Sequence, residues 1–174
     1  MPRRILVPLD GSHRAEAALA QLPEHCGRGD EITLLSVVKP APPEKIGTGL
    51  GQSASAYYNP RSSASARDIP VFETEEEARE RQLTNLGSYL STQADLLRKQ
   101  GFEVRVQPLL DSRPARAIIE YARSYRPSAI IMVRRTHDPR RLIFGSVSSE
   151  VARADVAPIL LLPSRHSTRE GFRA

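Results

Sequence analysis

Short runs of apolar residues alternate along the chain with segments in which apolar residues recur at helical spacing. The apolar runs have the length of single β-strands and cover residues 5–9, 32–38, 102–106, 129–133 and 158–162. Two segments between them carry apolar residues at i, i+3, i+4 and i+7, namely Ala15, Ala18, Leu19 and Leu22, and Ile118, Tyr121, Ala122 and Tyr125. Strand and helix in alternation predict an α/β fold built on a parallel sheet.

One predicted helix carries clear start and stop signals. Thr74 and Glu77 have the spacing of a capping box, and three successive glutamates suit the positive end of the helix dipole. Gly101 follows the last basic residues and is placed to adopt the left-handed C-cap conformation. We therefore predict a helix over residues 74–99. Another helix should have Pro114 in its first turn, where a missing N–H costs no hydrogen bond.

The character of the strands indicates their places in the sheet. Residues 102–106 alternate apolar and charged side chains, which suits an edge strand with one wetter face. Residues 158–162 form the last strand, are wholly apolar and are placed to be an edge too. Because an exposed apolar edge is a template for pairing with another chain, we predict a homodimer through this strand.

The length of the chain fits a single domain over residues 1–174. Residues 39–72 are rich in proline, glycine, serine and alanine and lack periodicity, so we expect a long flexible loop there. Within it, GTGLG neither follows a strand directly nor opens a helix, which is the context that a phosphate-binding glycine loop requires. We expect a short C-terminal tail from about residue 164.

Composition and charge narrow the classes of function. No apolar run approaches the roughly 18 residues of a membrane span, and the first apolar stretch is too short for a signal peptide, so we expect a cytoplasmic protein. The single cysteine, Cys26, excludes an internal disulfide and a thiolate metal cluster. The net charge of +5 raises nucleic acid as a partner, but no basic patch is interleaved with aromatic residues, so we expect no such partner.

Two turns at the carboxyl ends of predicted strands carry polar residues. Asp10 ends the first strand, and Gly11 and Ser12 turn into a helix. In open α/β sheets ligands bind at the edge where the strands end, so Asp10 is a candidate to bind a ribose or base. Asp10 and Ser12 equally suit the capping of a turn and a helix. Gly145 and Ser146 begin the last predicted helix. One interpretation is that the free N–H groups of the helix start bind an anion. The other is that Ser146 is only the N-cap of the helix.

Four stretches follow one another along the chain, RRILVPLDGSHRAEAALAQL, ITLLSVV, SAIIMV and GSVSSEVARADVAPILLLP. Together they resemble the universal stress protein family, and the likeness covers nearly the whole chain except residues 39–72. The resemblance implies a doubly wound open sheet of five parallel strands in the order 3-2-1-4-5 with helices on both faces, a Rossmann-like fold of the adenine nucleotide alpha hydrolase-like type. It also implies a homodimer through the fifth strand and makes ATP or AMP the candidate ligand.

The resemblance implies site residues at the matching positions. These are Pro8, Leu9 and Asp10 around the adenosine, Val38 at the adenine, and Gly145, Ser146 and Val147 at the phosphates. The glycine half of the family's phosphate motif is missing, because Val133 stands where its first glycine belongs and Arg134 follows in the turn that should hold the second. A β-branched residue cannot cheaply adopt a positive φ, so this loop must take another path.

The segment that replaces the glycines is rich in positive charge. Its four arginines, Arg134, Arg135, Arg140 and Arg141, either supply bidentate contacts to phosphate or form a solvated face. The four histidines of the chain show no metal-ligand spacing and no pairing with a nucleophile. We therefore predict no metal site, no catalytic residues and no dedicated enzyme, with any ATP hydrolysis slow and incidental.

Two hypotheses of function remain open. The first is a dimeric regulatory or binding module of the stress response with a degenerate nucleotide site. The alternative is an ATP- or AMP-binding nucleotide sensor with at most slow ATP hydrolysis, whose phosphates are held by arginines and by the Gly145–Ser146 helix start.

Overall fold

The computed structural model describes residues 2–50, 68–133 and 145–163. Two compact units can be distinguished, one formed by residues 1–40 and 83–174 and the other by residues 41–82. The prediction of one domain over the whole chain stays a prediction. The first unit holds the main sheet and the candidate site, and the second holds a β-hairpin and the first turns of a long helix.

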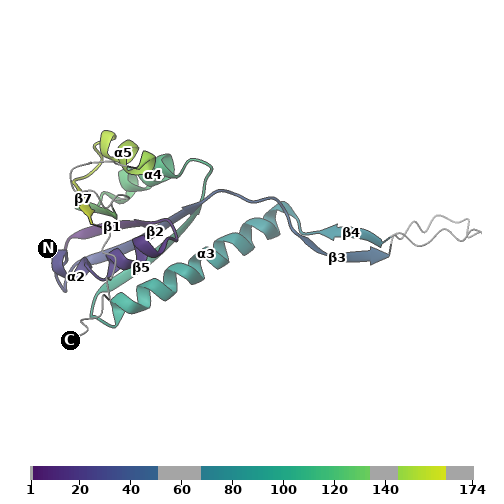
Figure 1. Cartoon of the computed structure of the whole chain (residues 1–174), viewed down its shortest axis with the longest axis horizontal. Coiled ribbons are helices and arrows are strands. Elements are labelled where there is room, and N and C mark those ends of the chain that lie inside the picture. The colour runs from purple at the N-terminus through teal and green to yellow at the C-terminus, as the bar shows by residue number, and fades with distance from the viewer. Residues whose placement is uncertain (1, 51–67, 134–144, 164–174) are drawn as a thin grey trace, which may run out of the picture. The chain divides into compact units, whose positions relative to one another are not determined.

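The main sheet has five parallel strands in the order β5-β2-β1-β6-β7 (Figure 1). Its strands are β1 (Arg4–Leu9), β2 (Glu31–Val38), β5 (Glu103–Leu110), β6 (Ala129–Val133) and β7 (Ile159–Leu162). Counted along the chain, these are the five predicted strands in the predicted order 3-2-1-4-5. The doubly wound α/β fold is therefore confirmed.

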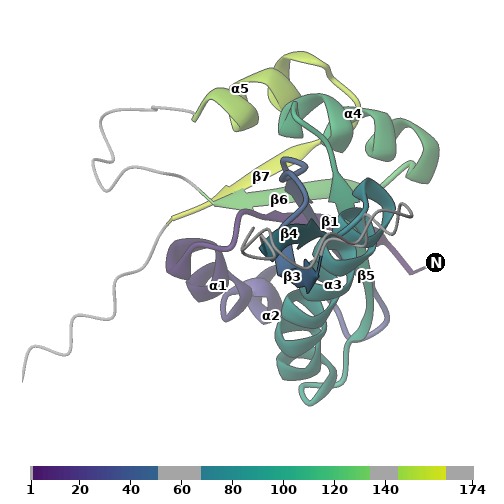
Figure 2. The same cartoon turned by 90° about the vertical axis from the view of Figure 1, so that its right-hand side faces the viewer.

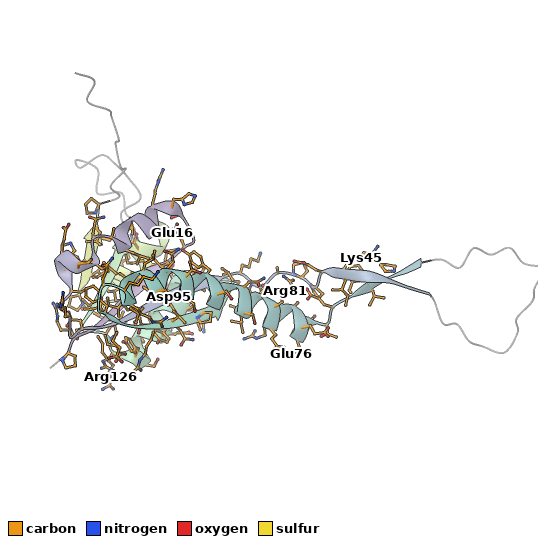
Figure 3. All side chains as sticks on the ribbon, turned by 90° about the horizontal axis from the view of Figure 1, so that it is seen from below. Glu16, Lys45, Glu76, Arg81, Asp95 and Arg126 are labelled. Atoms are coloured by element: carbon orange, nitrogen blue, oxygen red, sulfur yellow. The ribbon has the colours of Figure 1, made fainter. Side chains whose placement is uncertain are left out.

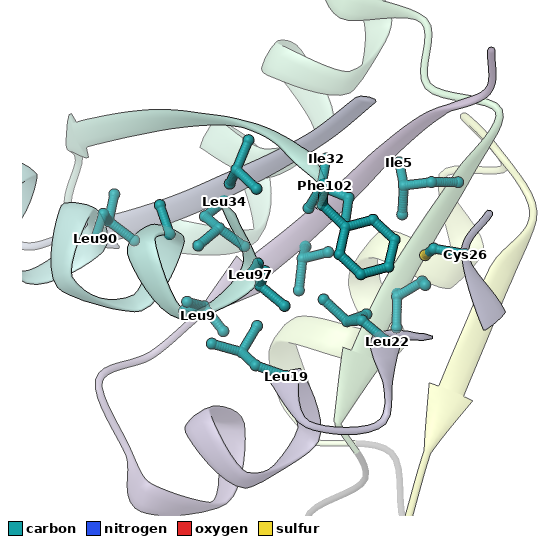
Figure 4. Packing of buried hydrophobic residues seen from close by; sticks show 14 of the residues in the cluster. Ile5, Leu9, Leu19, Leu22, Cys26, Ile32, Leu34, Leu90, Leu97 and Phe102 are labelled. Carbon is teal, nitrogen blue, oxygen red and sulfur yellow. The ribbon is translucent and has the colours of Figure 1, made fainter. Parts of the chain in front are cut away.

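Helices cover both faces of this sheet (Figure 2). The helices on one face are α1 (His13–Leu19), α2 (Leu22–His25) and the second half of α3 (Glu75–Arg98), and those on the other face are α4 (Pro114–Tyr125) and α5 (Ser146–Arg153). The first face has a core in which Phe102 and Leu97 pack with side chains of β1, β2, α1 and α2 (Figure 4). The second core centres on Leu6, Leu35 and Ile130 beneath α4 and α5.

The signals that predicted the long helix act as expected. The backbone N–H of Thr74 donates to Glu77 Oε2 at 2.7 Å, and the N–H of Glu77 donates to Thr74 Oγ1 at 3.2 Å, which is a reciprocal capping box. Gly101, beyond the end of the helix, has φ +91°, in the left-handed region that favours glycine. Pro114 is the first residue of α4. These predictions are confirmed.

The edges of the sheet are also the predicted ones, β5 and β7. Strand β5 is longer than the predicted residues 102–106, because it continues through Pro108 to Leu110. Proline is tolerated there because an edge strand has one side without a neighbouring strand, so its missing N–H need not be a ladder donor. On the other edge, Leu160 of β7 remains 38% exposed.

The prediction of a structureless loop over residues 39–72 is wrong at both ends of that segment. Strands β3 (Lys45–Leu50) and β4 (Asp68–Phe72) pair antiparallel as a separate two-stranded sheet, while residues 51–67 lie outside the described residues. These two strands lack the alternation of apolar and polar residues that would have predicted them from the sequence. They contain glycines and a proline, and their pairing shifts register between Lys45 and Gly47.

Polar contacts fix the base of this hairpin. The carboxylate of Glu73 is buried and accepts hydrogen bonds from the Glu44 N–H at 2.8 Å and from the Arg81 guanidinium at 2.6 and 3.1 Å. Arg81 also pairs with Glu44 at 3.1 Å. Figure 3 shows Arg81 on α3 and Lys45 on the hairpin. These bonds hold the two strands together at a place where their own side chains bury little.

Candidate functional site

A cavity of about 640 Å³ lies at the carboxyl ends of β1, β2 and β6, where α1, α4 and α5 begin. In open α/β sheets this edge is the usual ligand site, because the loops that follow the strands form a crevice there. The lining residues are Pro8, Leu9, Asp10, Ser12, His13, Arg14, Ala15, Leu35, Val37, Pro114, Ile118, Met132, Val133, Gly145, Val147 and Ser148.

The turn after β1 brings Asp10 to the cavity. Asp10 Oδ1 accepts hydrogen bonds from the Ser12 N–H at 3.1 Å and from the Ser12 hydroxyl at 2.5 Å, while Gly11 between them has φ +73°. Ser12 Oγ in turn accepts from the Ala15 N–H at 3.3 Å at the start of α1. Asp10 and Ser12 therefore do cap the turn and the helix, and Asp10 also remains exposed at the cavity.

The walls of the cavity are mainly apolar. Leu35 and Val37 come from β2, Met132 from β6 and Ile118 from α4. Beside them, the buried hydroxyl of Ser36 donates to the Leu9 carbonyl at 2.8 Å, which ties the ends of β1 and β2 together next to Asp10. An apolar pocket with a few polar groups at its rim is the usual form of a small-molecule site.

The start of α5 forms another side of the cavity. Gly145 is the N-cap of the helix, in an extended conformation with φ −61°, and it makes no side-chain cap. The buried hydroxyl of Ser148 donates to the Gly145 carbonyl at 3.1 Å and orients the first turn. Gly145 rather than Ser146 therefore caps this helix, so the interpretation of Ser146 as an N-cap is wrong.

The structure brings six of the predicted site residues to one cavity, namely Pro8, Leu9, Asp10, Val133, Gly145 and Val147. Val38 and Ser146 do not line it. On β2 the period of two directs Leu35 and Val37 toward the cavity, and the Val38 carbonyl accepts from the Asp111 N–H at 3.0 Å. Arg134 lies outside the described residues, as do Arg135, Arg140 and Arg141. The nucleotide contacts assigned to these residues stay predictions.

Val133 ends β6 in the extended conformation of a strand. A β-branched residue adopts this conformation without strain. The loop that we expect to take another path, residues 134–144, lies outside the described residues. Among the described residues, positive φ outside glycine occurs only at Arg126 and Asp155, both remote from the cavity lining.

Sequence reasoning missed several lining residues. Ser12, His13, Arg14 and Ala15 follow directly after Asp10, so their position at the start of a helix could have indicated them. Pro114 and Ile118 lie on α4, which begins after β5 at the same edge of the sheet, and only the strand order brings them to the cavity.

A half-buried tyrosine on α3 packs against the core of the first face. The side chain of Tyr89, from α3, packs against the core that contains Leu9 and Ala15, and its buried hydroxyl has no hydrogen-bond partner among the described residues. Burial raises the pKa of Tyr89 to about 12, and the negative charge of Glu16, the interaction of the hydroxyl with the Glu16 side chain and the negative charge of Asp10 act in the same direction. The hydroxyl therefore stays protonated at neutral pH.

The residues that the structure describes contain no cluster of three histidine, cysteine, aspartate or glutamate side chains that could hold a metal ion. Their helices include none with the length and apolar character to cross a membrane.

Comparisons with known proteins agree on one family. The model of the universal stress protein family matches residues 1–163. No curated protein matches the chain significantly by sequence. Among solved structures, hypothetical protein MJ0577 is similar with a TM-score of 0.63 and 21% identity, over 96% of this chain and 99% of that chain.

Two further structures show the same fold. Universal stress protein UspA from Lactobacillus plantarum has a TM-score of 0.58 and 21% identity, over 94% of this chain and 97% of that chain. A universal stress protein family protein from Arabidopsis thaliana, solved with AMP bound, has a TM-score of 0.55 and 14% identity, over 96% of this chain and 95% of that chain.

Proposed function

Because the chain belongs to the universal stress protein family, we propose that it is a regulatory module of the stress response that binds an adenine nucleotide in the cavity beside Asp10. The observation that carries the proposal is the cavity itself. One apolar pocket of about 640 Å³ joins the Asp10 turn, the ends of β2 and β6, and the start of α5. A structural neighbour from Arabidopsis thaliana was solved with AMP bound, which supports the choice of ligand class.

The cavity offers a place for each part of such a ligand. Leu35, Val37 and Met132 form an apolar wall for a flat base. The Asp10 carboxylate is available as an acceptor for ribose hydroxyl groups. Gly145 and the N–H groups of the first turn of α5 suit a phosphoryl group. We propose that the nucleoside is held in this way, while the phosphate half of the family motif is degenerate at Val133 and beyond.

We propose further that the module is not a dedicated enzyme, and that any hydrolysis of ATP is slow. In support, His13 at the rim of the cavity is fully exposed and contacts Glu16 at 3.4 Å rather than an activated nucleophile. A turnover assay with ATP and the purified protein tests this point, and sustained turnover above about 1 per second, within the usual range of enzymes, would contradict it. The cytoplasm remains the proposed location.

A homodimer through β7 is the proposed assembly. In the described sheet this strand pairs only with β6, and Leu160 on it is exposed. Leu160→Asp places a charge on the edge and should convert a dimer to a monomer in a measurement of solution mass by light scattering. Leu96→Asp on α3 is the matched control, because Leu96 is also an exposed leucine but lies away from β7. A monomeric wild-type protein would refute the proposed dimer.

The proposed ligand is tested by thermal unfolding with adenosine, AMP and ATP at millimolar concentration. A ligand that binds only the folded state raises the melting temperature, and at about 100 times its Kd it adds about 2.7 kcal/mol of stability. Asp10→Ala should abolish the shift. Asp111→Ala should retain it, because Asp111 makes a similar turn contact, to the Arg113 N–H at 2.7 Å, without lining the cavity.

The ligand series also separates the two hypotheses of function. A shift with all three ligands of similar size indicates a module that binds the nucleoside part and has lost its phosphate site. A shift that grows strongly from adenosine to ATP indicates a nucleotide sensor in which arginines replace the glycines. No shift with any of the three ligands would refute the proposal.

A further inference from the structure

The hairpin of β3 and β4 exposes large apolar side chains. Ile46 is 63% exposed, Phe72 57% and Val71 42%, and these are three of the five exposed large apolar side chains in the described part of the chain. Exposed apolar side chains that gather in one place mark interaction surfaces. A two-stranded hairpin that buries so little is also marginally stable in water, so a partner that covers these side chains would stabilise it.

The edges of the hairpin are poorly suited to bind another strand. Strand β4 contains Pro70, which has no N–H to donate, and β3 begins with Lys45 and a register shift before Gly47. Proline, lysine and irregular pairing are features that protect sheet edges from further pairing. A partner is therefore bound through the side chains of the hairpin, of which Phe72 is the largest exposed apolar one.

The chain continues from Phe72 into an acidic stretch. Residues 72–82 contain five glutamates and two arginines. Glu75, Glu76 and Glu80 lie on the first turns of α3 and are exposed (Figure 3 labels Glu76). The hairpin thus presents an apolar anchor beside negative charge. The surface that complements it is an apolar pocket with basic side chains around it.

The outer side of α4 offers such a pocket. It has a volume of about 280 Å³, and its apolar lining comes from Leu109, Leu110, Ala117 and Tyr121. All of its lining residues belong to the first unit, and none of them lines the cavity beside Asp10. The pocket is therefore distinct from the proposed nucleotide site.

Positive charge surrounds this pocket. Four exposed arginines lie on α4 or at its ends, namely Arg113, Arg116, Arg123 and Arg126. The two carboxylates that line the pocket are already engaged, since Asp111 accepts from the Arg113 N–H at 2.7 Å and Glu120 accepts from the Arg116 guanidinium at 2.6 Å. Arginines outnumber carboxylates here, so this surface attracts an acidic segment.

We propose that the hairpin of one copy docks on α4 of a second copy, with Phe72 in the pocket and the glutamates at the start of α3 facing the arginines. A second copy is the occupant because this chain carries both halves of the contact with opposite charge. A buried aromatic anchor with a charged rim is a common form of protein interface. The contact is small, so the association is weak and depends on protein concentration.

Nuclear magnetic resonance on a mixed sample tests the contact. One copy is isotope-labelled, and the other is the Lys45→Cys variant with a nitroxide spin label on the hairpin. Cys26 is 7% exposed, so the label attaches to the new cysteine. We expect the signals of Ala117, Tyr121 and Ser124 in the isotope-labelled copy to broaden as the spin-labelled copy is added. Wild-type protein treated with the same label should cause no broadening.

Two variants separate the apolar anchor from the charged rim. Phe72→Ser in the spin-labelled copy should weaken the association about tenfold or more, and Leu96→Ser, at another exposed leucine on α3, should not. Ser124→Glu in the isotope-labelled copy adds negative charge at the pocket and should weaken the association about threefold to fivefold. Ser88→Glu, at an exposed serine of α3 outside the pocket, is the control and should leave it unchanged.

Several results would overturn the proposal. No broadening at millimolar protein would show that the hairpin does not contact a second copy. Broadening confined to other parts of the isotope-labelled copy would place the hairpin elsewhere. Broadening at α4 only when both labels are on the same chain would show that the hairpin docks on its own α4. Equal weakening by Ser124→Glu and Ser88→Glu would show attraction by overall charge rather than docking at the pocket.

Discussion

The buried hydroxyl of Ser36 allows a sharp test of how the fold positions the cavity. Its hydrogen bond to the Leu9 carbonyl, at 2.8 Å, joins the ends of β1 and β2 one residue before Asp10. Ser36 is 2% exposed and Leu9 is 3% exposed, so Ser36→Ala removes this donor from the Leu9 carbonyl at a buried position. We expect a loss of about 1–3 kcal/mol of unfolding free energy.

For a domain of this size, each kcal/mol lowers the melting temperature by roughly 2–4 °C, so calorimetry can resolve the effect. Because the end of β1 is loosened, we also expect the affinity for AMP to fall by about threefold or more, measured by titration. Thr33→Val is the matched control on the same strand. The Thr33 hydroxyl is also buried and donates to Tyr125 Oη at 3.0 Å, near the amino end of β2.

The control should lose similar stability and keep its affinity for AMP. Equal losses of affinity in both variants would show that binding follows overall stability rather than the Ser36 bond. No loss of affinity in Ser36→Ala, with a clear loss of stability, would refute the idea that this bond positions Asp10.

Three further predictions concern the fold. The Arg3 guanidinium lowers the pKa of Asp30 through side-chain hydrogen bonds, so the ionised carboxylate stabilises the protein at neutral pH. This stability is lost as the pH falls below about 4. In a pH series of melting temperatures, Asp30→Asn should therefore lose less stability in acid than the wild type does. Thr74→Ala removes the capping box and should cost about 1 kcal/mol in denaturant unfolding, and an unchanged midpoint would contradict that. Gly101→Ala places a side chain at a backbone φ of +91° and should lower the melting temperature. Gly29→Ala is the control and should leave the melting temperature unchanged, because Gly29 lies outside the positive-φ region and has open space around it.

Much of the fold was predictable because its signals are local. The five strands are short apolar runs, and the order of the edges follows from the charged alternation in β5 and the position of β7 at the end of the chain. Thr74, Glu77 and Gly101 each act through their own backbone neighbours, so their roles could be read from spacing alone.

Features that depend on distant contacts were missed. The hairpin of β3 and β4 is held by Glu73 and Arg81, which lie outside the strands themselves, and its strands lack alternation. The helix predicted from the spacing of Ala15, Leu19 and Leu22 is two helices, because Pro23 near the start of α2 removes a backbone donor.

The candidate site was predictable in part for the same reason. The end of the first strand and the start of the last helix can be predicted from the sequence, and Asp10, Gly145 and Val147 lie there. The structure places these three residues at one cavity. Ser148 gains its place from the way α5 packs on the sheet, which the local sequence pattern does not show.

The central claim is that an adenine nucleotide occupies the cavity at the carboxyl ends of β1, β2 and β6. Its most direct test is a nuclear magnetic resonance titration of the isotope-labelled protein with AMP, in which each backbone N–H reports on its own surroundings. We predict saturable shifts of the signals of Asp10, Gly11 and the residues from Gly145 to Ser148, with none at the amino ends of the strands around Asp30. Shifts confined to other parts of the chain, or no shifts at millimolar AMP, would contradict the claim.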